Sequence, residues 1–582
     1  MGALLTCLLA PFVNKSARSS SVLDLSSVCS SFKSQNIYPV PTANNKVSCP
    51  GNDSKVIYVS ASGNDSNNGL TVSTPVKTVS KAMQMVRKNS PDWIVLKRGE
   101  TFSGGLGKIR SRKGENYWGG KSVDRPFVIS SYGKSLKRPI IKVSNDNNGI
   151  GIWGPFRNVT ISGLEFYSKP GTGGTGIRTL YEGTNYVIHN NYISGFGVGI
   201  NVQAKVEENK KFSKVFIKDN IITDSASSGK GHSQGVFAKG VEKLNIVGNV
   251  IDHCGWYLDR DGELPNSRIA TKFNHCLYLQ NGGYPAMVKN NIVTRASSHG
   301  LQARSGGIVV NNLFARNPIQ FFISSKGLNG DANQSRMIAK NNMVLEATDI
   351  NYQMPRGTGI QHNNAYFALY EDNVVAHVLS ASKSNKRAIQ IVCKTDDVHT
   401  SISGQCRARF RNNLVYNWGN DFGGYLVSAK DFKNSLGIEH QVINNHFAIA
   451  DSRAKFINVQ RETLKNKYLF HGNTYSSPQI ETKNLFTLPG KAKVSFPQWK
   501  SKVEKTAKGV NTVEFVDPCR TMATYYDDKV LGNTNNDNCK IMHDKKLFEQ
   551  FMDLAKQKNS LVEGSGVTVN SVIDYIREGF NR

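Results

Sequence analysis

The sequence lacks any apolar run that approaches the roughly 20 residues needed to span a membrane as a helix. It is also poor in proline: 18 prolines, 52 glycines and 20% charged residues describe a turn-rich folded chain, not a disordered one. Acidic residues are in short supply, because 44 Asp and Glu oppose 73 Lys and Arg and leave a net charge of +29. Such a charge favours polyanionic partners, whether nucleic acid, an acidic surface or an acidic polysaccharide, over a chemically neutral ligand.

No CxxC motif occurs among the nine cysteines, which disfavours zinc sites and thioredoxin-type redox chemistry. With Cys7 set aside, the cysteines fall into four local pairs: Cys29/Cys49, Cys254/Cys276, Cys393/Cys406 and Cys519/Cys539. Short-range disulfides formed in an oxidising compartment are the preferred interpretation, and scattered buried thiols are the alternative.

The opening stretch MGALLTCLLAPFV is apolar but short, and it has no positively charged start. A clipped signal peptide would account for the unpaired Cys7, and a lipoprotein anchor at Cys7 is the other interpretation. We therefore expect a secreted, periplasmic or cell-surface protein.

P-loop and EF-hand signatures are absent, as are nucleic-acid-binding motifs. The stretch GNDSNNG (Gly63–Gly69) has oxygen ligands for Ca²⁺ but no terminal Glu, so a capping loop is preferred. No cofactor is assigned, and Ca²⁺ is left open. Coiled-coil heptads are also missing, and we expect a monomer instead of a trimeric spike.

What the sequence does contain is a repeat: a short apolar strand that runs into an Asn pair or a variant of it. The second turn residues are Asn191, Asn220, Asn249, Asn291, Asn312, Asn342, Asn364, Asn413, Asn445 and Asn473. The shortest intervals set the basic coil, and the longer ones indicate inserted loops.

The repeated segments are rich in Val, Ile and Phe, and they lack the 3.6-residue period of helical solenoids. Asn tolerates the left-handed conformation of a sharp corner, and stacked Asn side chains can hydrogen-bond from coil to coil. Parallel connections wind right-handed. The predicted fold class is therefore all-β: a right-handed parallel β-helix solenoid.

Both ends of the coil need caps. Residues 56–88 read as strand, polar loop and a helix from about Ser80, and DWIVLKRGETF follows as the next strand. This opening resembles that of secreted members of the pectate-lyase-like β-helix superfamily, where a capping helix precedes the coils. We expect a poorly specified export segment over 1–54, the β-helix over 55–490, and a C-terminal cap or tail over 491–582. In that last part KKLFEQFMDLAKQKN and VNSVIDYIREGF have helical periodicity and are expected to fold back as a second cap.

One pair of strands carries unusual residues. FNHCLYLQNGG and SSHGLQARSGG align on their glycines and place His275 above His299. Because side chains alternate along a strand, Leu277 and Leu301 point inward and their neighbours outward. Stacking with GVFAKG, GINVQ and IQFFISS gives two outward columns: Asn201–Phe237–Tyr278–Gln302–Phe322 and Gln203–Lys239–Gln280–Arg304–Ser324. Aromatics, amides and cations so interleaved suit a sugar-binding groove, although an ordinary solvated sheet face is the alternative.

His275 and His299 lie at the starts of their strands. By strict alternation they would point inward with the leucines, but a residue at a corner need not follow that alternation. They are either satisfied corner residues or groups that transfer protons beside the groove. A long loop beside them carries aromatic and charged residues that could contact sugars, or that simply pack on the coils: Trp256, Tyr257, Asp259, Asp261, Glu263 and Arg268.

For an acidic polysaccharide, the resemblance to the family implies β-elimination. The uronate carboxylate must be neutralised, a base must remove the C5 proton, and an acid must assist the leaving oxygen. We predict that Arg304, with Lys239, neutralises the carboxylate. His275 or His299 is the base, and Tyr278 is the acid or a second base. Phe237, Gln280, Gln302, Trp256, Tyr257, Lys272 and Arg268 are predicted to bind substrate, and Lys272 and Arg295 are second-rank catalytic candidates.

Three alternatives stay open. A C5-epimerase would use the same residues. A glycoside hydrolase needs two flanking carboxyl groups, and Asp252, Asp259, Asp261 and Glu263 are bunched near one loop. The stretch SHG resembles the GHG motif of polygalacturonases, without a convincing set of matching aspartates. The third alternative is a non-catalytic carbohydrate-binding β-helix, such as an adhesin or spike.

Overall fold

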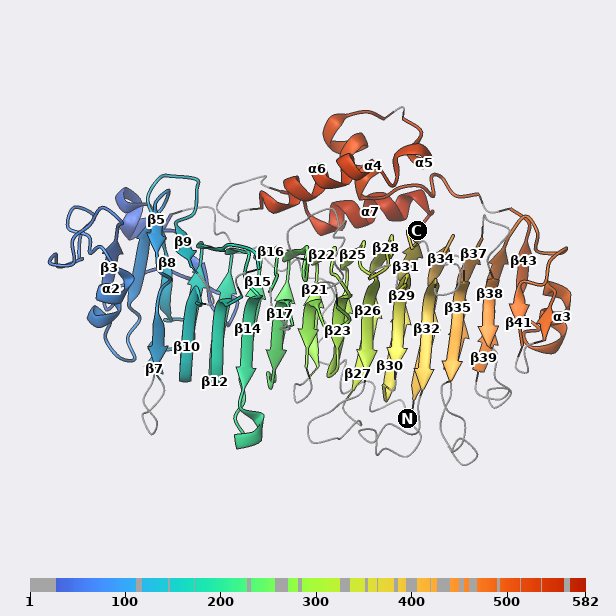
Figure 1. Cartoon of the computed structure of the whole chain (residues 1–582), viewed down its shortest axis with the longest axis horizontal. Coiled ribbons are helices and arrows are strands. Elements are labelled where there is room, and N and C mark those ends of the chain that lie inside the picture. The colour runs from blue at the N-terminus through green and yellow to red at the C-terminus, as the bar shows by residue number, and fades with distance from the viewer. Residues whose placement is uncertain are drawn as a thin grey trace.

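The computed structural model describes residues 28–582 apart from segments at 111–117, 145–146, 172, 228–231, 257–270, 281–284, 325–334, 351–353, 364, 381–385, 394–405, 419, 427–439, 450–454, 460–467, 489–491, 513, 535 and 559–565. At positions 110, 393, 420–426 and 459 it describes the backbone only. The chain winds into a single long right-handed β-helix, as predicted, whose axis runs horizontally in Figure 1.

Each coil contributes up to three short strands, and the three parallel sheets that result are called the first, second and third faces. The first face carries the residues singled out in the sequence. Its strands are β14 (Val198–Ala204), β17 (Gln234–Lys239), β20 (His275–Leu279), β23 (His299–Ala303), β26 (Ile319–Ser324), β29 (Thr358–Asn363), β32 (Arg387–Cys393), β35 (Asn420–Leu426), β38 (Lys455–Val459) and β41 (Phe486–Thr487).

The second face begins at the N-terminal end of the coil. It contains β3 (Val56–Val59), β4 (Trp93–Lys97), β8 (Phe127–Tyr132), β15 (Val215–Lys218), β18 (Leu244–Val247), β21 (Ala286–Lys289), β24 (Gly306–Val310), β27 (Arg336–Lys340), β30 (Phe367–Glu371), β33 (Arg407–Arg411), β36 (His440–Ile443) and β39 (Tyr468–His471). Two long strands, β10 (Ile150–Ser162) and β12 (Thr175–His189), run through both the first and second faces, because β12 pairs with β14 and also with β15.

The third face is a sheet of 14 strands. These are β5 (Thr101–Ser103), β9 (Ile140–Val143), β11 (Glu165–Ser168), β13 (Tyr192–Ser194), β16 (Ile221–Thr223), β19 (Val250–Asp252), β22 (Ile292–Thr294), β25 (Leu313–Ala315), β28 (Met343–Leu345), β31 (Val374–Ala376), β34 (Leu414–Tyr416), β37 (His446–Ala448), β40 (Thr474–Ser476) and β43 (Lys508–Val510). Inward Ile, Val, Leu and Phe side chains from all three faces form one continuous core along the axis.

The predicted asparagine ladder lies at the corner between the second and third faces. Asn291 donates from its backbone N and its Nδ2 to Oδ1 of Asn312, at 3.0 and 2.9 Å, and its Nδ2 also donates to the Ile246 carbonyl. The residue before each ladder position takes the left-handed conformation, as at Asn290 with φ 55°. Buried amides are thus satisfied coil by coil, from Asn191 to Asn473.

One predicted member of the ladder is wrong. The ladder passes from Asn342 to Asn373 and then to Asn413, at 2.9 Å in both steps. Asn364, predicted for this coil, lies outside the described residues. The strand of this coil ends in Glu-Asp-Asn instead of an Asn pair, and Asp372 occupies the left-handed position with φ 54°.

Helices close both ends of the core. Helix α2 (Val79–Met85) buries Val79 and Ala82 against the first coils, as the resemblance implied. At the other end α3 (Phe496–Lys502) buries Phe496 and Trp499. Glu504 ends the ladder there by accepting from the backbone N of Asn473 at 2.8 Å.

The remaining C-terminal helices do not cap the end, contrary to the expectation. Helices α6 (Lys545–Lys556) and α7 (Val569–Gly579), with the short α4 (Met522–Tyr525) and α5 (Asn538–Ile541), lie along the side of the coil, over the third face (Figure 1). Many outward residues of that face are apolar, among them Ile292, Leu313 and Met343, and these pack against Phe548, Phe551 and Met552.

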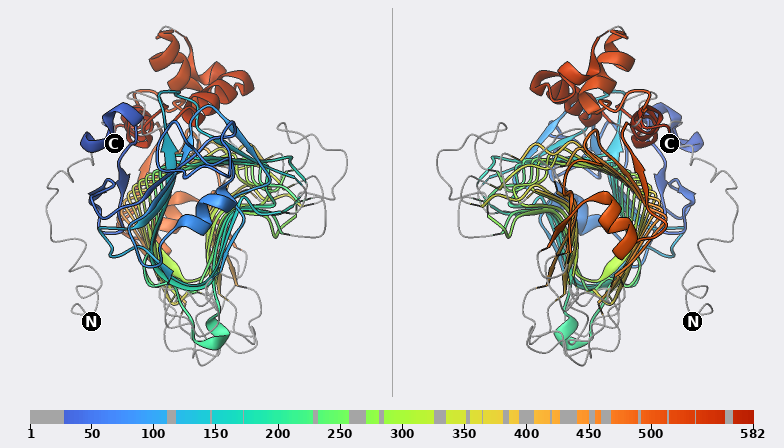
Figure 2. Two further views of the ribbon diagram at one scale, coloured as in Figure 1. Left: turned by 90° about the vertical axis from the view of Figure 1, so that its left-hand side faces the viewer. Right: turned by 90° about the vertical axis from the view of Figure 1, so that its right-hand side faces the viewer.

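An N-terminal strap, residues 28–48, covers part of the second face. It consists of a 3₁₀ turn (Ser30–Gln35) and the antiparallel pair β1 (Val40–Pro41) and β2 (Val47–Ser48). Its Ile37 and Val40 are buried with Trp93, Val95 and Val128 of β4 and β8. End-on views show the strap and the C-terminal helices on the outside of the coil (Figure 2).

Three predicted disulfides are present: Cys29–Cys49, which anchors the strap, Cys254–Cys276 and Cys519–Cys539. The side chain of Cys393, needed for the fourth, is not among those described. No helix in the described part of the chain is both long and apolar enough to cross a membrane.

Candidate functional site

The outward column predicted for the first face is present in register. Asn201 pairs with Phe237, Phe237 with Tyr278, Tyr278 with Gln302, and Gln302 with Phe322. The column continues for two more coils, through Gln361 and Gln390. Alternation along short buried strands therefore predicts correctly which residues leave the core here.

The two histidines lie side by side and face outward with this column. His275 pairs with His299, and their ring centroids are 4.6 Å apart at a steep angle. Cys276 and Leu277 are both buried in the core, so the alternation slips by one residue at the corner. That slip turns His275 outward, to within 4.8 Å of the Tyr278 ring.

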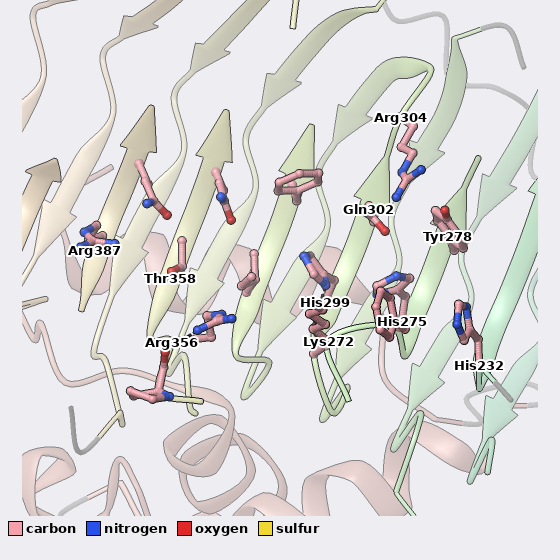
Figure 3. Close-up of a pocket in the computed structure, with 17 residues that line it drawn as sticks. His232, Lys272, His275, Tyr278, His299, Gln302, Arg304, Arg356, Thr358 and Arg387 are labelled. Atoms are coloured by element: carbon pink, nitrogen blue, oxygen red, sulfur yellow. Dashed lines mark hydrogen bonds between the residues drawn. The ribbon is translucent and has the colours of Figure 1, made fainter. Parts of the chain in front are cut away.

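These side chains line a cavity of about 500 Å³ that lies over strands β20 to β32 of the first face (Figure 3). The cavity is rich in cationic and aromatic groups, and no Asp or Glu occurs among its lining residues in the described part of the chain. The lining residues are His232, Lys272, Phe273, His275, Tyr278, Ser298, His299, Gln302, Arg304, Ile319, Phe322, Pro355, Arg356, Thr358, Gln361, Arg387 and Gln390.

Two of its guanidinium groups form no ion pair with a carboxylate among the described residues, although the charge of Asp349 acts on Arg356. Arg304 lies over the ring of Tyr278, with its central carbon 5.3 Å from the ring centroid. Arg356 donates to the carbonyl of Pro355 at 2.9 Å, and burial followed by the nearby charge of Arg387 lowers its pKa. Such half-buried charges favour an anion in the cavity, since an unpaired charge away from water is costly.

Both histidines are held in the neutral form. Burial lowers the pKa of His299 to about 3, and the charges of Arg356 and Arg304 add to this effect. Burial, with His299 and Arg304 next, sets the pKa of His275 well below the ordinary 6.5. At neutral pH each ring is therefore unprotonated, the form that a general base needs, and the same burial makes it a weaker base than a free histidine.

Tyr278 has the opposite property. Burial raises the pKa of its phenol above 10, although Arg304 and a hydrogen bond with Gln280 oppose that shift. The phenol keeps its proton at neutral pH and can donate it. A neutral imidazole and a protonated phenol thus stand next to each other at the cavity wall.

Two polar atoms of the wall have no hydrogen-bond partner among the described residues. His299 Nδ1 is 2.8 Å from Ser298 Oγ. In contrast, His275 Nδ1 and Gln302 Oε1 are buried with no hydrogen-bond partner. Buried polar groups are rarely left unpaired in a native structure, so these two atoms are available to water or to polar groups of a ligand.

The cavity brings together six of the predicted site residues: His275, Tyr278, His299, Gln302, Arg304 and Lys272. Four others lie outside it. Lys239 forms an ion pair with Glu207, Phe237 packs against Tyr278 with centroids 5.5 Å apart, and Gln280 bonds to Tyr278. The indole of Trp256 donates to the Arg295 carbonyl at 2.9 Å. Tyr257 and Arg268, like Asp259, Asp261 and Glu263, lie outside the described residues.

Arg295 is not near the cavity, so its second-rank place among the catalytic candidates is not supported. It projects from the third face and bonds Asp252 through Nε at 2.8 Å, beneath helix α6. Asp252 is buried and is also paired with Lys556 at 2.7 Å, which removes it from the candidate acids of a hydrolase.

Sequence reasoning missed much of the far side of the cavity. Gln361 and Gln390 could have been found by continuing the outward column for two coils. Arg387 is instead in register with Thr358, in the column that begins with His275 and His299. His232, Phe273 and Arg356 precede their strands, at corners where period 2 gives no direction. His232 and Phe273 stack face to face, with centroids 5.0 Å apart.

The described residues hold little that would bind a metal. Their one close group of metal-ligating side chains is Asp517 with Cys519 and Cys539, and these two cysteines form a disulfide. The stretch Gly63–Gly69 holds the capping loop together: Asp65 accepts hydrogen bonds from the backbone N of Lys77 and Thr78, at 2.9 and 2.8 Å.

A family model described as the right-handed beta helix region matches residues 140–319. No curated protein matches the sequence. Similar solved structures include a rhamnogalacturonan lyase, at 13% identity and a TM-score of 0.34, with 72% of this chain and 87% of that one covered.

Two further similar structures are the GH136 lacto-N-biosidase from Eubacterium ramulus and XylC with xylose. The first has 14% identity and a TM-score of 0.39, with 72% of this chain and 67% of that one covered. The second has 9% identity and a TM-score of 0.40, with 79% and 86% covered. Similarity of this degree says nothing about activity. With its parallel coils and the matched family model, the chain is a right-handed parallel β-helix protein, as its resemblance to the pectate-lyase-like superfamily implied.

Proposed function

We propose that this protein binds an anionic, uronic-acid polysaccharide in the first-face cavity and cleaves it by β-elimination. The observation that carries the proposal is the composition of the cavity wall. It combines Lys272 and three arginines with two neutral histidines and a protonated tyrosine, and its described lining residues include no carboxylate.

The chemistry assigns a role to each group. Arg304 pairs with the uronate carboxylate and stabilises the negative charge that develops when the C5 proton leaves. His299 or His275 takes that proton on a ring nitrogen. The electron pair of the C5–H bond forms a C4–C5 double bond, the C4–O bond breaks, and Tyr278 donates its proton to the leaving oxygen. The low pKa values of His275 and His299 and the raised pKa of Tyr278 support this assignment of base and acid.

Hydrolysis needs two carboxyl groups that flank the scissile bond. Since the described lining residues include none, the cavity supports elimination better than hydrolysis. Epimerisation at C5 would use the same base and the same Arg304, and the experiment below separates the two. We also propose that the protein acts as an exported monomer, because disulfides are typical of an oxidising compartment.

The test is to incubate the protein with alginate, pectate, hyaluronan, chondroitin and heparin, each with Ca²⁺ and with EDTA. We expect ultraviolet absorbance of an unsaturated uronate to rise on one of these polymers, together with new reducing ends. Reducing ends without that absorbance would replace elimination with hydrolysis. If neither appears but the C5 proton exchanges with deuterated solvent, the protein is an epimerase, and silence in all three measurements favours a binding protein.

A further inference from the structure

A serine in the cavity wall contacts one of the two histidines. Ser298 is buried, and its Oγ lies 2.8 Å from Nδ1 of His299, the next residue along the chain. The backbone carbonyl of Ser298 accepts from the backbone N of Ile319 in the following coil, at 3.0 Å, so the serine is fixed in the sheet. The ring of His299 is therefore held at one of its nitrogens by the protein.

The neighbouring histidine lacks this contact. His275 pairs with His299 across the two strands, but its Nδ1 is buried with no hydrogen-bond partner among the described residues. A neutral imidazole carries its proton on one of two nitrogens, and a fixed hydrogen bond at either of them selects the tautomer. Such a bond is present at Nδ1 of His299 and, in the described part of the chain, missing at Nδ1 of His275.

The charges of the cavity indicate which nitrogen of His299 carries the proton. With Nδ1 turned to Ser298, the ring presents Nε2 to the cavity, which His299 lines. Arg356 and Arg304 are both close enough for their charges to lower the pKa of this ring. A lone pair on Nε2 is attracted to these cations, whereas an N–H group there would point its positive end at them. The proton is therefore more stable on Nδ1, where the oxygen of Ser298 accepts its hydrogen bond.

We propose that Ser298 positions His299 as the base of the elimination, by accepting a hydrogen bond from Nδ1–H and leaving the Nε2 lone pair toward the substrate. The inference rests on the proposed function for the reaction, and it chooses between the two histidines. The C5 proton moves to Nε2, and the electron pair of the C5–H bond forms the C4–C5 double bond. The ring becomes an imidazolium that still donates from Nδ1 to Ser298, and it later returns the proton to water. The hydroxyl hydrogen of Ser298, which also lines the cavity, is directed to the ligand or to water.

Substrate binding strengthens this base. The charge of Arg304 is one cause of the low pKa of His299, after burial and the charge of Arg356. A uronate carboxylate paired with Arg304 offsets that charge, and the oxygen of Ser298 stabilises the imidazolium through the bond from Nδ1. His299 therefore accepts a proton more readily in the complex than in the free protein.

The test compares Ser298→Ala with Ser297→Ala in the full chain. Ser297 is the preceding residue and is also buried, but its Oγ has no hydrogen-bond partner among the described residues, which makes it a matched control. Both kcat and KM are measured from product absorbance, on whichever of the five polymers the protein cleaves. Long-range ¹H–¹⁵N spectra of histidine-labelled protein at neutral pH show which nitrogen of His299 carries the proton, and His299→Asn assigns the signal.

We expect Ser298→Ala to lower kcat by about tenfold or more and to leave KM within about twofold of the wild type. Ser297→Ala should change neither constant by more than about twofold. The spectra should place the proton on Nδ1 in the wild type and in Ser297→Ala, and should show it shared between both nitrogens in Ser298→Ala.

The inference is overturned by a wild-type ring that is protonated on Nε2, or by a tautomer that does not respond to Ser298→Ala. It is also overturned if Ser298→Ala keeps a normal kcat, or if both variants lose kcat equally. If no polymer gives an unsaturated product, β-elimination fails, and the spectra alone then decide whether Ser298 sets the tautomer of His299.

Discussion

The first and third faces of this β-helix carry the same kinds of charged residue and use them differently. On the third face Arg295 bonds Asp252, and Arg316 bonds Glu346 at 2.9 Å while it stacks on Phe548, 3.7 Å away. On the first face Arg304 and Arg356 are also partly buried, but they form no ion pair with a carboxylate among the described residues.

The difference follows from what covers each face. Helices α6 and α7 cover the third face, and two charges beneath α6 are neutralised by that helix: Lys556 pairs with Asp252, and Glu549 pairs with Arg295. No described helix covers the first-face cavity, and Arg304 and Arg356 form no ion pair with a carboxylate among the described residues. We therefore expect paired charge to mark the part of the molecule that holds the fold, and the unpaired charge of Arg304 and Arg356 to mark the part that binds a ligand.

Substitution of the two cavity histidines should have the largest effect on activity. Replacing His275 or His299 by Ala should lower kcat about 10²- to 10⁴-fold for the residue that is the base, with little change in the melting midpoint. The matched control is His377→Asn on the third face, where the left-handed backbone (φ 64°) suits Asn. That variant should leave kcat unchanged. Both cavity variants retaining kcat within tenfold of wild type would remove the histidines from the mechanism.

The pH dependence of kcat/KM tests the role of His299 in a second way. Because the pKa of His299 is held at about 3, the base stays neutral far below the ordinary histidine range. The acid limb of kcat/KM should therefore lie well below pH 6.5. A limb centred near 6.5 would mean that a solvent-exposed group, not this ring, is the base.

The asparagine ladder is expected to stabilise the fold without affecting the cavity. Asn312→Ala removes the acceptor of two Asn291 donors and the Nδ2 donor to Asn342 Oδ1, so it should lower the free energy of unfolding by about 3 kcal/mol. Asn290→Gly keeps the left-handed turn and should cost about 1 kcal/mol or less. Chemical denaturation measures both, and equal losses would show that the turn, not the ladder, supplies the stability.

Acid should weaken the fold through histidines that are buried and neutral, in the core and in the cavity alike. In the unfolded chain they bind protons near pH 6.5, whereas burial holds the pKa of His189, His299 and His362 at about 3 in the fold. Stability is therefore full above about pH 6.5 and falls as the pH drops toward 3. Each such histidine contributes a slope of about 1.4 kcal/mol per pH unit. Thermal midpoints between pH 7.5 and 4.5 test this, and His299→Gln should make the decline less steep.

Much of this arrangement could be predicted from sequence because the repeat is local. Strand, corner and ladder recur in each coil, and period 2 correctly places Tyr278 and Gln302 outward. It could not place His275, because a corner shifts the alternation by one residue. It also missed Asn373, because Asp372 takes the corner position usually held by Asn and hides the pair.

Contacts between segments that are distant in the sequence could not be predicted either. The amphipathic helices at 545–556 and 569–579 were visible as periodicity, but periodicity does not say which surface a helix covers. The apolar outward residues of the third face, such as Ile292 and Met343, carried that information. Arg356 and Arg387 come from coils distant in sequence, and only the stacking of coils brings them to the cavity that His299 also lines.

The most direct test of the division between paired and unpaired charge measures two arginine variants in two ways. Arg304→Gln and Arg295→Gln are each compared with the wild type for polyuronate affinity and for the thermal midpoint. We expect Arg304→Gln to bind at least tenfold more weakly and to melt like the wild type. Arg295→Gln should bind like the wild type and lose about 3–5 kcal/mol of stability. An Arg304→Gln protein that melts early and binds normally would contradict the account.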